Sequence, residues 1–163
     1  MAYSQGVPAN DLIKALSEFK GIARRFSYEI NTPERVYIDD YAHHPTAINA
    51  VYNTLRAQYP NKKITAIFQP HLYSRTQDFA HEFAASLSLF DTLFLLDIYP
   101  ARELPIAGVT SDWLLGMISS KKKSKATVAE VLKSLKENPP EVLVSLGAGD
   151  IGKQVVHFKE ALL

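Results

Sequence analysis

Residues 39–47 read DDYAHHPTA and place two carboxylates, a phenol and two imidazoles in one short run. Carboxylate and imidazole groups are frequent metal ligands, and the same groups serve as general acids and bases. A dedicated metal site is disfavoured here, because side chains of adjacent histidines point in different directions and the helical H-E-x-x-H spacing is absent. The run is therefore more typical of a ligand-binding turn than of a metal cluster.

Asp39, Asp40 and Tyr41 are the residues of this run for which we predict a ligand role. Carboxylates at the end of a buried strand are costly to desolvate unless something binds them, and ribose hydroxyls or an ammonium group would be natural partners. His44 has a structural alternative, as the capping residue of a helix that begins at Pro45.

Two further runs combine a cation with polar neighbours. In PHLYSRT, residues 70–76, the guanidinium of Arg75 is suited to bind a carboxylate or phosphate through paired hydrogen bonds. A salt bridge from Arg75 to Asp78 is the equally supported alternative. In YPARE, residues 99–103, Arg102 and Glu103 could simply pair with each other or face solvent.

GAGDIGKQ, residues 147–154, satisfies G-x-G-x-x-G and nearly satisfies the P-loop pattern. Gln154 replaces the hydroxyl that should hold Mg²⁺, and Asp150 would place a carboxylate among backbone N–H groups meant for phosphate. Too little chain follows Gly152 for a complete dinucleotide-binding unit. We predict a tight strand-to-helix turn, with a supporting ligand contact from its backbone as the open alternative.

Hydrophobic periodicity indicates which elements carry these runs. Helical spacing predicts helices over 9–19 with Asn10 as N-cap, 45–58, 77–90, 111–119, 128–137 and 150–161. Apolar runs predict strands in RRFSYEI, RVYIDDYA, KITAIFQ, TLFLLDI, KATV and PPEVLVSL. Buried strands that alternate with helices predict an α/β fold with a mostly parallel sheet.

This alternation also predicts where ligands bind. In an open parallel sheet, ligands bind outside the carboxyl ends of the strands. Four of the predicted strands end in DDYAHH, QPHLYSR, DIYPARE and GAGD. We therefore predict that these polar groups share one edge of the sheet and form a ligand-binding edge.

Composition limits the class of protein. The 163 residues are 47% hydrophobic and 21% charged, which suits one soluble globular domain. A net charge of +1 gives no case for binding nucleic acid or an anionic membrane, and KKKSK at 121–125 is interpreted as a solvated loop. The absence of cysteine suits a reducing cytoplasm, and no apolar run approaches the roughly 18 residues of a membrane span.

RRF, DDYAHHPT, FQPHLYSRT, DIYPARE and GAGDI, in this order, resemble the C-terminal domain of the Mur ligases. Within that family they resemble the branch that joins L-alanine to UDP-N-acetylmuramate. The resemblance runs from about Phe19 to the end of the chain. It implies a three-layer Rossmann-like domain over residues 21–163, preceded at residues 1–20 by the last helix of a central ATP-binding domain and a linker.

The resemblance implies an ATP-dependent, amide-forming ligase of peptidoglycan precursor synthesis in the cytoplasm. ATP would phosphorylate the muramic acid carboxylate, and L-alanine would attack the acyl phosphate. The implied partners are an N-terminal UDP-sugar domain and a central ATPase domain, with ATP and Mg²⁺ bound in the complete enzyme. The present domain alone is expected to be inactive, with no catalytic residue, metal site or tightly bound cofactor of its own.

The resemblance also carries over to individual positions. Arg25 matches an arginine that contacts the nucleotide, and Asp40 matches the acid at the ribose. The positions expected to line the L-alanine site are Tyr41, His43, His71 and Arg75, of which Arg75 would hold the alanine carboxylate. Leu72 stands where many relatives have a second arginine, so that contact must be absent or supplied elsewhere.

Two alternatives remain open at this point. A murein-peptide ligase of the recycling pathway shares a similar aspartate–histidine motif but adds a peptide in place of alanine. A non-catalytic nucleotide-binding or regulatory domain would also suit GAGDIG and a chain of this length.

Overall fold

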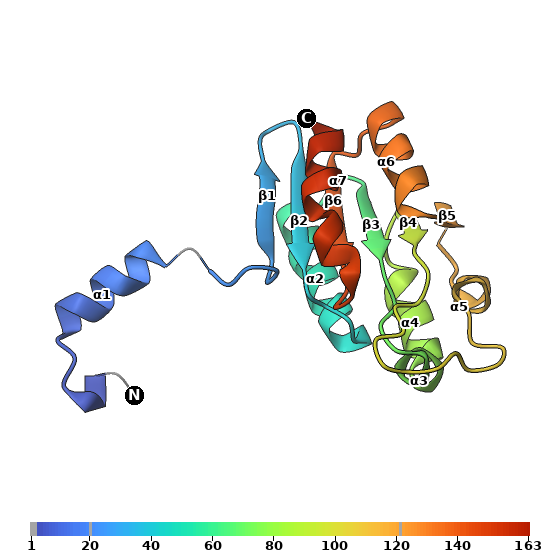
Figure 1. The fold of residues 1–163 in the computed structure, drawn as a ribbon. Coiled ribbons are helices and arrows are strands. Elements are labelled where there is room, and N and C mark those ends of the chain that lie inside the picture. Colours follow the sequence, from blue (N-terminus) through green and yellow to red (C-terminus); the bar gives the residue numbers. More distant parts are fainter. Residues whose placement is uncertain (1–2, 20, 121) are drawn as a thin grey trace.

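A computed structural model of the chain describes residues 3–19, 21–120 and 122–163 (Figure 1). Its centre is a six-stranded sheet in the order β1-β2-β6-β3-β4-β5. β1 is antiparallel to β2, and the other neighbouring strands are parallel. The strands are β1 (Ser27–Asn31), β2 (Val36–Asp40), β3 (Ile64–Phe68), β4 (Thr92–Leu95), β5 (Lys122–Lys125) and β6 (Val142–Leu146).

Helices cover both faces of this sheet and complete three layers (Figure 1). α2, α4 and α5 pack on one face, and α6 and α7 pack on the other. The described helices are α1 (Ala9–Glu18), α2 (Pro45–Gln58), α3 (Tyr73–Asp78), α4 (Ala80–Leu87), α5 (Ser111–Met117), α6 (Val128–Glu137) and α7 (Val155–Leu162), with short 3₁₀ turns η1 (Tyr3–Gln5) and η2 (Asp150–Gln154). The predicted α/β fold is confirmed.

The central strands are buried on both faces, as their sequences predict. Every residue of β3 (ITAIF) and β6 (VLVSL) is buried. Successive side chains of a strand point to opposite faces, so Ile38 of β2 joins the core under α2 while Tyr37 joins the core under α6 and α7. This burial fixes the strand ends in space and so anchors the start of each loop that follows them.

The basic run at 121–125 is the clearest error of the sequence prediction. Its described part, Lys122–Lys125, is the edge strand β5 and not a solvated loop, and the strand predicted at KATV ends where KATV begins. Backbone pairing with β4, in the register Thr92↔Lys122, creates this strand while all its side chains stay exposed. Lysines suit such an edge because they discourage further strand pairing.

Helix boundaries were predicted less well than helix positions. The helix expected at 77–90 begins earlier, at Tyr73, and is broken at Phe79 (φ −115°, ψ 25°) into α3 and α4. The helix expected at 150–161 begins as the 3₁₀ turn η2. Asn10 is not an N-cap, because α1 starts after Pro8 without a side-chain cap. The cap predicted at His44 is confirmed: its side chain accepts a hydrogen bond from Thr46 N–H, and Pro45 begins α2.

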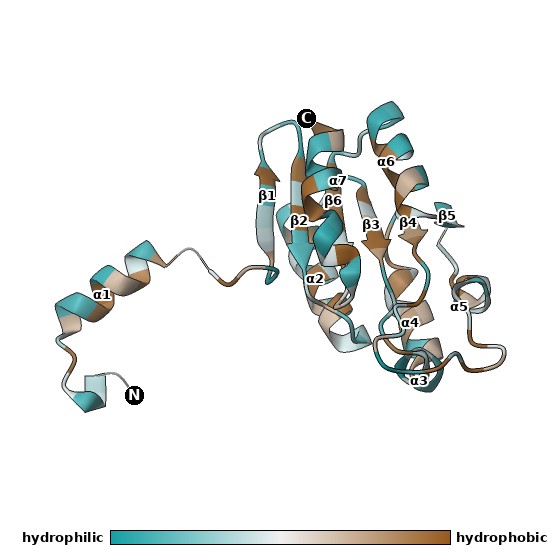
Figure 2. Ribbon diagram, viewed as in Figure 1, coloured by the Kyte–Doolittle hydropathy of each residue, from teal (hydrophilic) through white to brown (hydrophobic). Residues whose placement is uncertain are grey.

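α1 lies apart from the sheet in Figure 1 and has no buried residue. Its apolar side chains include Ile13 and Leu16, both largely exposed, and Figure 2 shows hydrophobic segments along the helix. That residues 1–20 belong to a preceding domain stays a prediction. No helix among the described residues is long and apolar enough to span a membrane.

Candidate functional site

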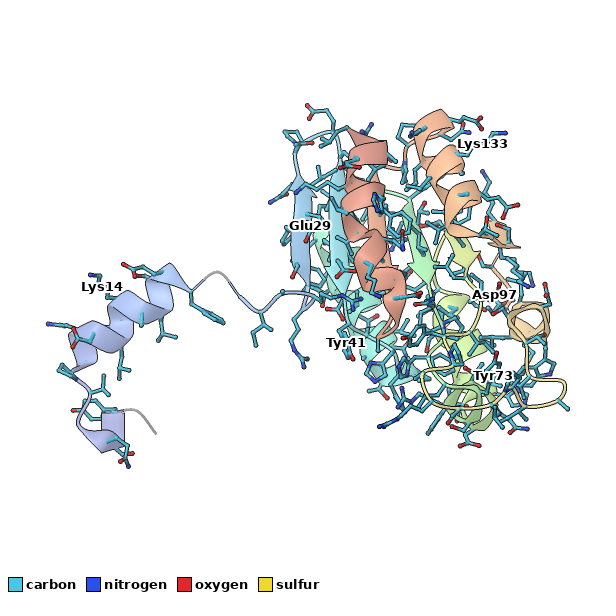
Figure 3. All side chains as sticks on the ribbon, viewed as in Figure 1. Lys14, Glu29, Tyr41, Tyr73, Asp97 and Lys133 are labelled. Atoms are coloured by element: carbon cyan, nitrogen blue, oxygen red, sulfur yellow. The ribbon has the colours of Figure 1, made fainter. Side chains whose placement is uncertain are left out.

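The carboxyl ends of β2, β3, β4 and β6 lie at one edge of the sheet, because these strands are parallel. Figure 3 shows Tyr41, Tyr73 and Asp97 toward this edge, whereas Lys133 of α6 lies near the opposite end of the sheet. The polar groups of four sequence segments are therefore brought to one edge, as predicted.

Three of the four residues expected to line the amino-acid site form a row of rings. The ring centroids of Tyr41 and His43 lie 5.2 Å apart, and those of His43 and His71 lie 6.0 Å apart. Tyr99, which was predicted to lie at this edge but was given no individual role, extends the row by stacking on His71 at 5.7 Å. An isolated parallel β-bridge between His71 and Tyr99 holds the two loops together.

Arg75, the fourth predicted residue, lies in α3, four residues after His71 in the sequence. Its Nη1 lies 3.5 Å from His71 Nδ1, so the guanidinium joins the row of rings. Leu72, between them at the start of α3, has a positive φ of 73°. The alternative salt bridge to Asp78 is absent among the described ion pairs.

Glu103 reaches the same place from the loop after β4. Its carboxylate accepts hydrogen bonds from the N–H (3.0 Å) and the hydroxyl of Ser74. The pairing with Arg102 considered from the sequence is therefore not what the structure shows. Hydrogen bonds from Ser74 lower the pKa of Glu103, so this carboxylate is ionised at neutral pH beside the start of α3.

The surroundings of His71 favour the neutral form of its imidazole. Burial lowers the pKa of His71, and the neighbouring charges of Arg75 and His43 lower it further, while Glu103 acts in the opposite direction. The imidazole is therefore neutral at neutral pH. The edge consequently presents a cationic guanidinium beside a neutral imidazole that can accept or donate a hydrogen bond.

Asp39 was expected to need an external ligand, but the chain supplies its partners. The side chain is 1% exposed, and Arg24 Nε lies 2.9 Å from Oδ2. Ser145 Oγ of β6 donates a hydrogen bond of 2.6 Å to Oδ1. The desolvation argument was sound, yet the cost is offset inside the domain, so Asp39 is a structural carboxylate.

Tyr37 completes this buried group. Its hydroxyl lies 2.9 Å from Ser145 Oγ. Because the single proton of Ser145 points to Asp39, the Tyr37 hydroxyl must donate in turn. Burial raises the pKa of Tyr37 far above its ordinary value, so this donor keeps its proton at every physiological pH.

Asp40, at the end of β2, lies beside the turn that carries Arg25, the other predicted nucleotide contact. Asp40 accepts hydrogen bonds from Phe26 N–H (2.6 Å) at Oδ2 and from Ala42 N–H (2.7 Å) at Oδ1. Arg25 is exposed, between Arg24 and Phe26, whose φ angles of 60° and 47° are both left-handed. Asp40 thus fixes the turn that presents Arg25, and each of its oxygens keeps lone pairs for a further hydrogen bond.

The glycines of GAGDIG are explained by packing. Gly147 has a φ of 146°, and a Cβ there would lie 2.8 Å from the backbone oxygen of Gln69. A Cβ on Gly149 would lie 2.8 Å from Tyr99 Cβ. Gln69 donates to Asp150 (2.7 Å) and accepts from Ile151 N–H (2.9 Å), which fastens the turn to β3. The prediction of a tight strand-to-helix turn is confirmed.

A cavity of about 240 Å³ lies beside Gln69, Asp97, Thr127 and Asp150. Another cavity, of about 410 Å³, lies at the other end of the sheet beside Lys63, Thr65 and Thr92, away from the ring row. We place the site at the carboxyl edge, because the charged and aromatic groups converge there. Among the described residues no group of three or more His, Asp or Glu side chains could hold a metal ion.

Known proteins resemble this chain over most of its length. A family model described as "Mur ligase, glutamate ligase domain" matches residues 24–151, which include the carboxyl edge. A UDP-N-acetylmuramate–L-alanine ligase of Flavobacterium psychrophilum is 55% identical over 99% of this chain. The chain spans only 36% of the length of that relative.

Solved structures share the fold. A UDP-N-acetylmuramate-alanine ligase of Thermotoga maritima matches 98% of this chain and 33% of its own, with 25% identity and a TM-score of 0.66. A murein peptide ligase of Psychrobacter arcticus, 22% identical, covers 99% of this chain and 34% of its own with a TM-score of 0.65, which shows the fold alone. Since the family model covers most of the chain, the chain belongs to the Mur ligase, glutamate ligase domain family.

Proposed function

We propose that this chain is the C-terminal domain of an ATP-dependent ligase that joins L-alanine to UDP-N-acetylmuramate. The observation that carries the proposal is the convergence of Tyr41, His43, His71 and Arg75 at the carboxyl edge. The name of the 55% identical relative supports L-alanine as the amino acid.

Arg75 binds the carboxylate of L-alanine in this proposal. A guanidinium forms two parallel hydrogen bonds with a carboxylate, which fixes both position and orientation. His71, neutral because burial lowers its pKa, adds no second charge that would compete for the carboxylate. Tyr41 and His43 enclose the other side of the amino acid. The alanine amine is then presented to an acyl phosphate formed on the muramic acid carboxylate.

The attack forms the amide bond between the alanine nitrogen and the carbonyl carbon, and phosphate leaves. Aminolysis of an acyl phosphate needs positioning and charge stabilisation more than a protein nucleophile. The edge offers these and no nucleophile–base pair, so we assign no catalytic residue to this domain. Closure over the other domains would exclude water from the hydrolysable intermediate.

Arg25 and Asp40 form the nucleotide side of the proposal. The exposed Arg25 guanidinium is free to contact phosphate, and Asp40 can accept a hydrogen bond from a ribose hydroxyl. ATP would bind with Mg²⁺, and we place the protein ligands of that ion in the central domain. We place the phosphate-binding loop in a central domain that α1 would help to complete, and the whole enzyme in the cytoplasm, where its substrates are made.

The test is a chimaera in which this chain replaces the matching segment of the Flavobacterium psychrophilum relative. ATP-dependent phosphate release is measured with UDP-N-acetylmuramate and L-alanine, with a tripeptide in place of alanine, and with neither. Turnover that requires L-alanine supports the proposal. Turnover with the tripeptide alone would identify a murein-peptide ligase, and turnover by residues 1–163 alone would contradict the dependence on other domains.

A further inference from the structure

Arg24 directly precedes Arg25, the predicted nucleotide contact. Unlike Arg25, Arg24 turns its side chain inward, toward Asp39 and Gly147. Nε lies 2.9 Å from Asp39 Oδ2, and Nη2 donates a hydrogen bond of 2.6 Å to the carbonyl oxygen of Gly147. One guanidinium therefore ties the end of β2 to the glycine turn after β6. Its two bonds come from different nitrogens, so a lysine could not reproduce them.

The same guanidinium also lies against Tyr41. Arg24 Cζ is 5.2 Å from the centre of the Tyr41 ring, within the range of a cation–π contact. Tyr41 N–H donates to the backbone oxygen of Arg24 at 2.7 Å. Arg24 therefore contacts both the backbone and the ring of Tyr41, a residue that is 41% exposed.

Gly152 provides the space on the other side of the guanidinium. A Cβ on Gly152 would lie 2.5 Å from Arg24 Nη1 and 2.7 Å from Cζ. The guanidinium is pinned by Asp39 and Gly147, so it could not move aside without breaking those bonds. The third glycine of GAGDIG is thus required by the Arg24 side chain.

We propose that Arg24 is a positioning residue of the amino-acid site, which acts by holding Tyr41 and the Gly147 turn in place. From Tyr41 the ring row continues through His43 to His71 and Arg75. Displacement of Tyr41 would therefore change the shape of the amino-acid site and leave Arg75, the proposed carboxylate-binding residue, in place. The proposal rests on the function proposed above for that edge.

Arg56 offers a matched control elsewhere in the domain. It combines the same kinds of contact, with Nη2 2.9 Å from Asp91 Oδ2 and Cζ 5.6 Å from the centre of the Tyr52 ring. Tyr52 packs on Phe90 and not on the ring row. Arg56→Met therefore removes an equivalent arginine without reaching the proposed site.

The first test compares the aromatic NMR spectra of two variants of this chain, Arg24→Met and Arg56→Met, with the spectrum of the unaltered chain. We expect Arg24→Met to shift the ring resonances of Tyr41 and His43 and to leave those of Tyr52 and Phe90 in place, and Arg56→Met to do the reverse. Unchanged Tyr41 and His43 resonances in Arg24→Met would overturn the proposal, and so would equal, molecule-wide shifts in both variants.

Gly152→Ala is the second variant, because Arg24→Met leaves the buried Asp39 without its cation and could unfold the chain. The added methyl should displace the guanidinium while its charge remains, and should shift the same Tyr41 and His43 resonances. Gly116→Ala is its control, since a Cβ there meets nothing within 4 Å. Identical Tyr41 and His43 spectra in the two glycine variants would count against the proposal.

A kinetic test uses the chimaera described above. We expect Arg24→Met to raise the KM for L-alanine about tenfold or more, since small misplacements of binding groups are costly, while Arg24→Lys recovers only part of this loss. Arg56→Met should leave that KM unchanged. An inactive parent chimaera would count against the proposed function, and the NMR comparison would still decide the role of Arg24.

Discussion

Ser145 of β6 donates a 2.6 Å hydrogen bond to Asp39 of β2, and the two residues are paired in register across the sheet. With Arg24 on the other carboxylate oxygen, a fully buried charge has a partner for each oxygen. This buried ionic group thus supports the carboxyl edge, where the exposed residues of the site lie.

Replacing Ser145 by Ala should destabilise the domain by about 1–3 kcal/mol. The substitution leaves one Asp39 oxygen and the Tyr37 hydroxyl buried without a partner, and unmade buried hydrogen bonds cost about that much. Urea unfolding measures the change. Ser124→Ala, on the exposed edge strand, is the control and should stay within about 0.5 kcal/mol of the parent. Equal costs at the two serines would contradict the role given to this hydrogen bond.

His71 should make the stability of the domain depend on pH in the acidic range. Its folded pKa lies below the ordinary 6.5, so at pH values under 6.5 the unfolded chain binds a proton that the folded chain excludes. Stability is therefore complete above 6.5 and falls as the pH drops below it.

His71→Gln should remove this part of the pH dependence. The difference in unfolding free energy between about pH 7.5 and about pH 5.5 should shrink, and His81→Gln, at an exposed position of α4, is the control. Ionisation of Glu103, whose pKa is also lowered, affects both variants alike at more acidic pH. The assignment fails if the His71 and His81 variants show the same pH profile as the parent.

At position 72 a glycine variant should be more stable than an alanine variant, which is the reverse of the usual order of stability. Its φ of 73° and ψ of 134° are strained for any residue with a Cβ. We expect Leu72→Gly to be more stable than Leu72→Ala by about 1 kcal/mol. At exposed Ala129 of α6, the glycine variant should instead be less stable by about 1 kcal/mol. Thermal unfolding of the glycine and alanine forms at positions 72 and 129 measures these differences. A Leu72→Ala variant more stable than Leu72→Gly would show that the backbone at position 72 is not strained.

Much of the fold was predictable from the sequence. The apolar runs ITAIF and VLVSL indicated buried strands, and the parallel sheet that they imply brought the polar loops to one edge. β5 was predicted too late in the sequence, at KATV, because its lysines carry no strand pattern and only pairing with β4 creates it. Local periodicity likewise did not indicate the break at Phe79, whose ring packs against His44.

The site was predicted in outline, but not which residues support it. Arg24 and Arg25 are neighbours of the same type, and only the left-handed turn at Arg24 and Phe26 sends one inward and the other outward. The single serine of VLVSL was a signal that could have been used, because a hydroxyl in a buried strand needs a partner. Its partner, Asp39, is identified only once the strand order is known.

The measurement that tests the central claim most directly is the alanine dependence of the chimaera carrying Arg75→Ala. The account predicts a KM for L-alanine raised by about tenfold to hundredfold, because the carboxylate loses a charge-assisted pair of hydrogen bonds, with the KM for ATP little changed. Arg102→Ala, at an exposed arginine of the neighbouring loop, should behave like the parent. An unchanged KM for L-alanine in the Arg75→Ala enzyme would contradict the claim that this edge binds the amino acid.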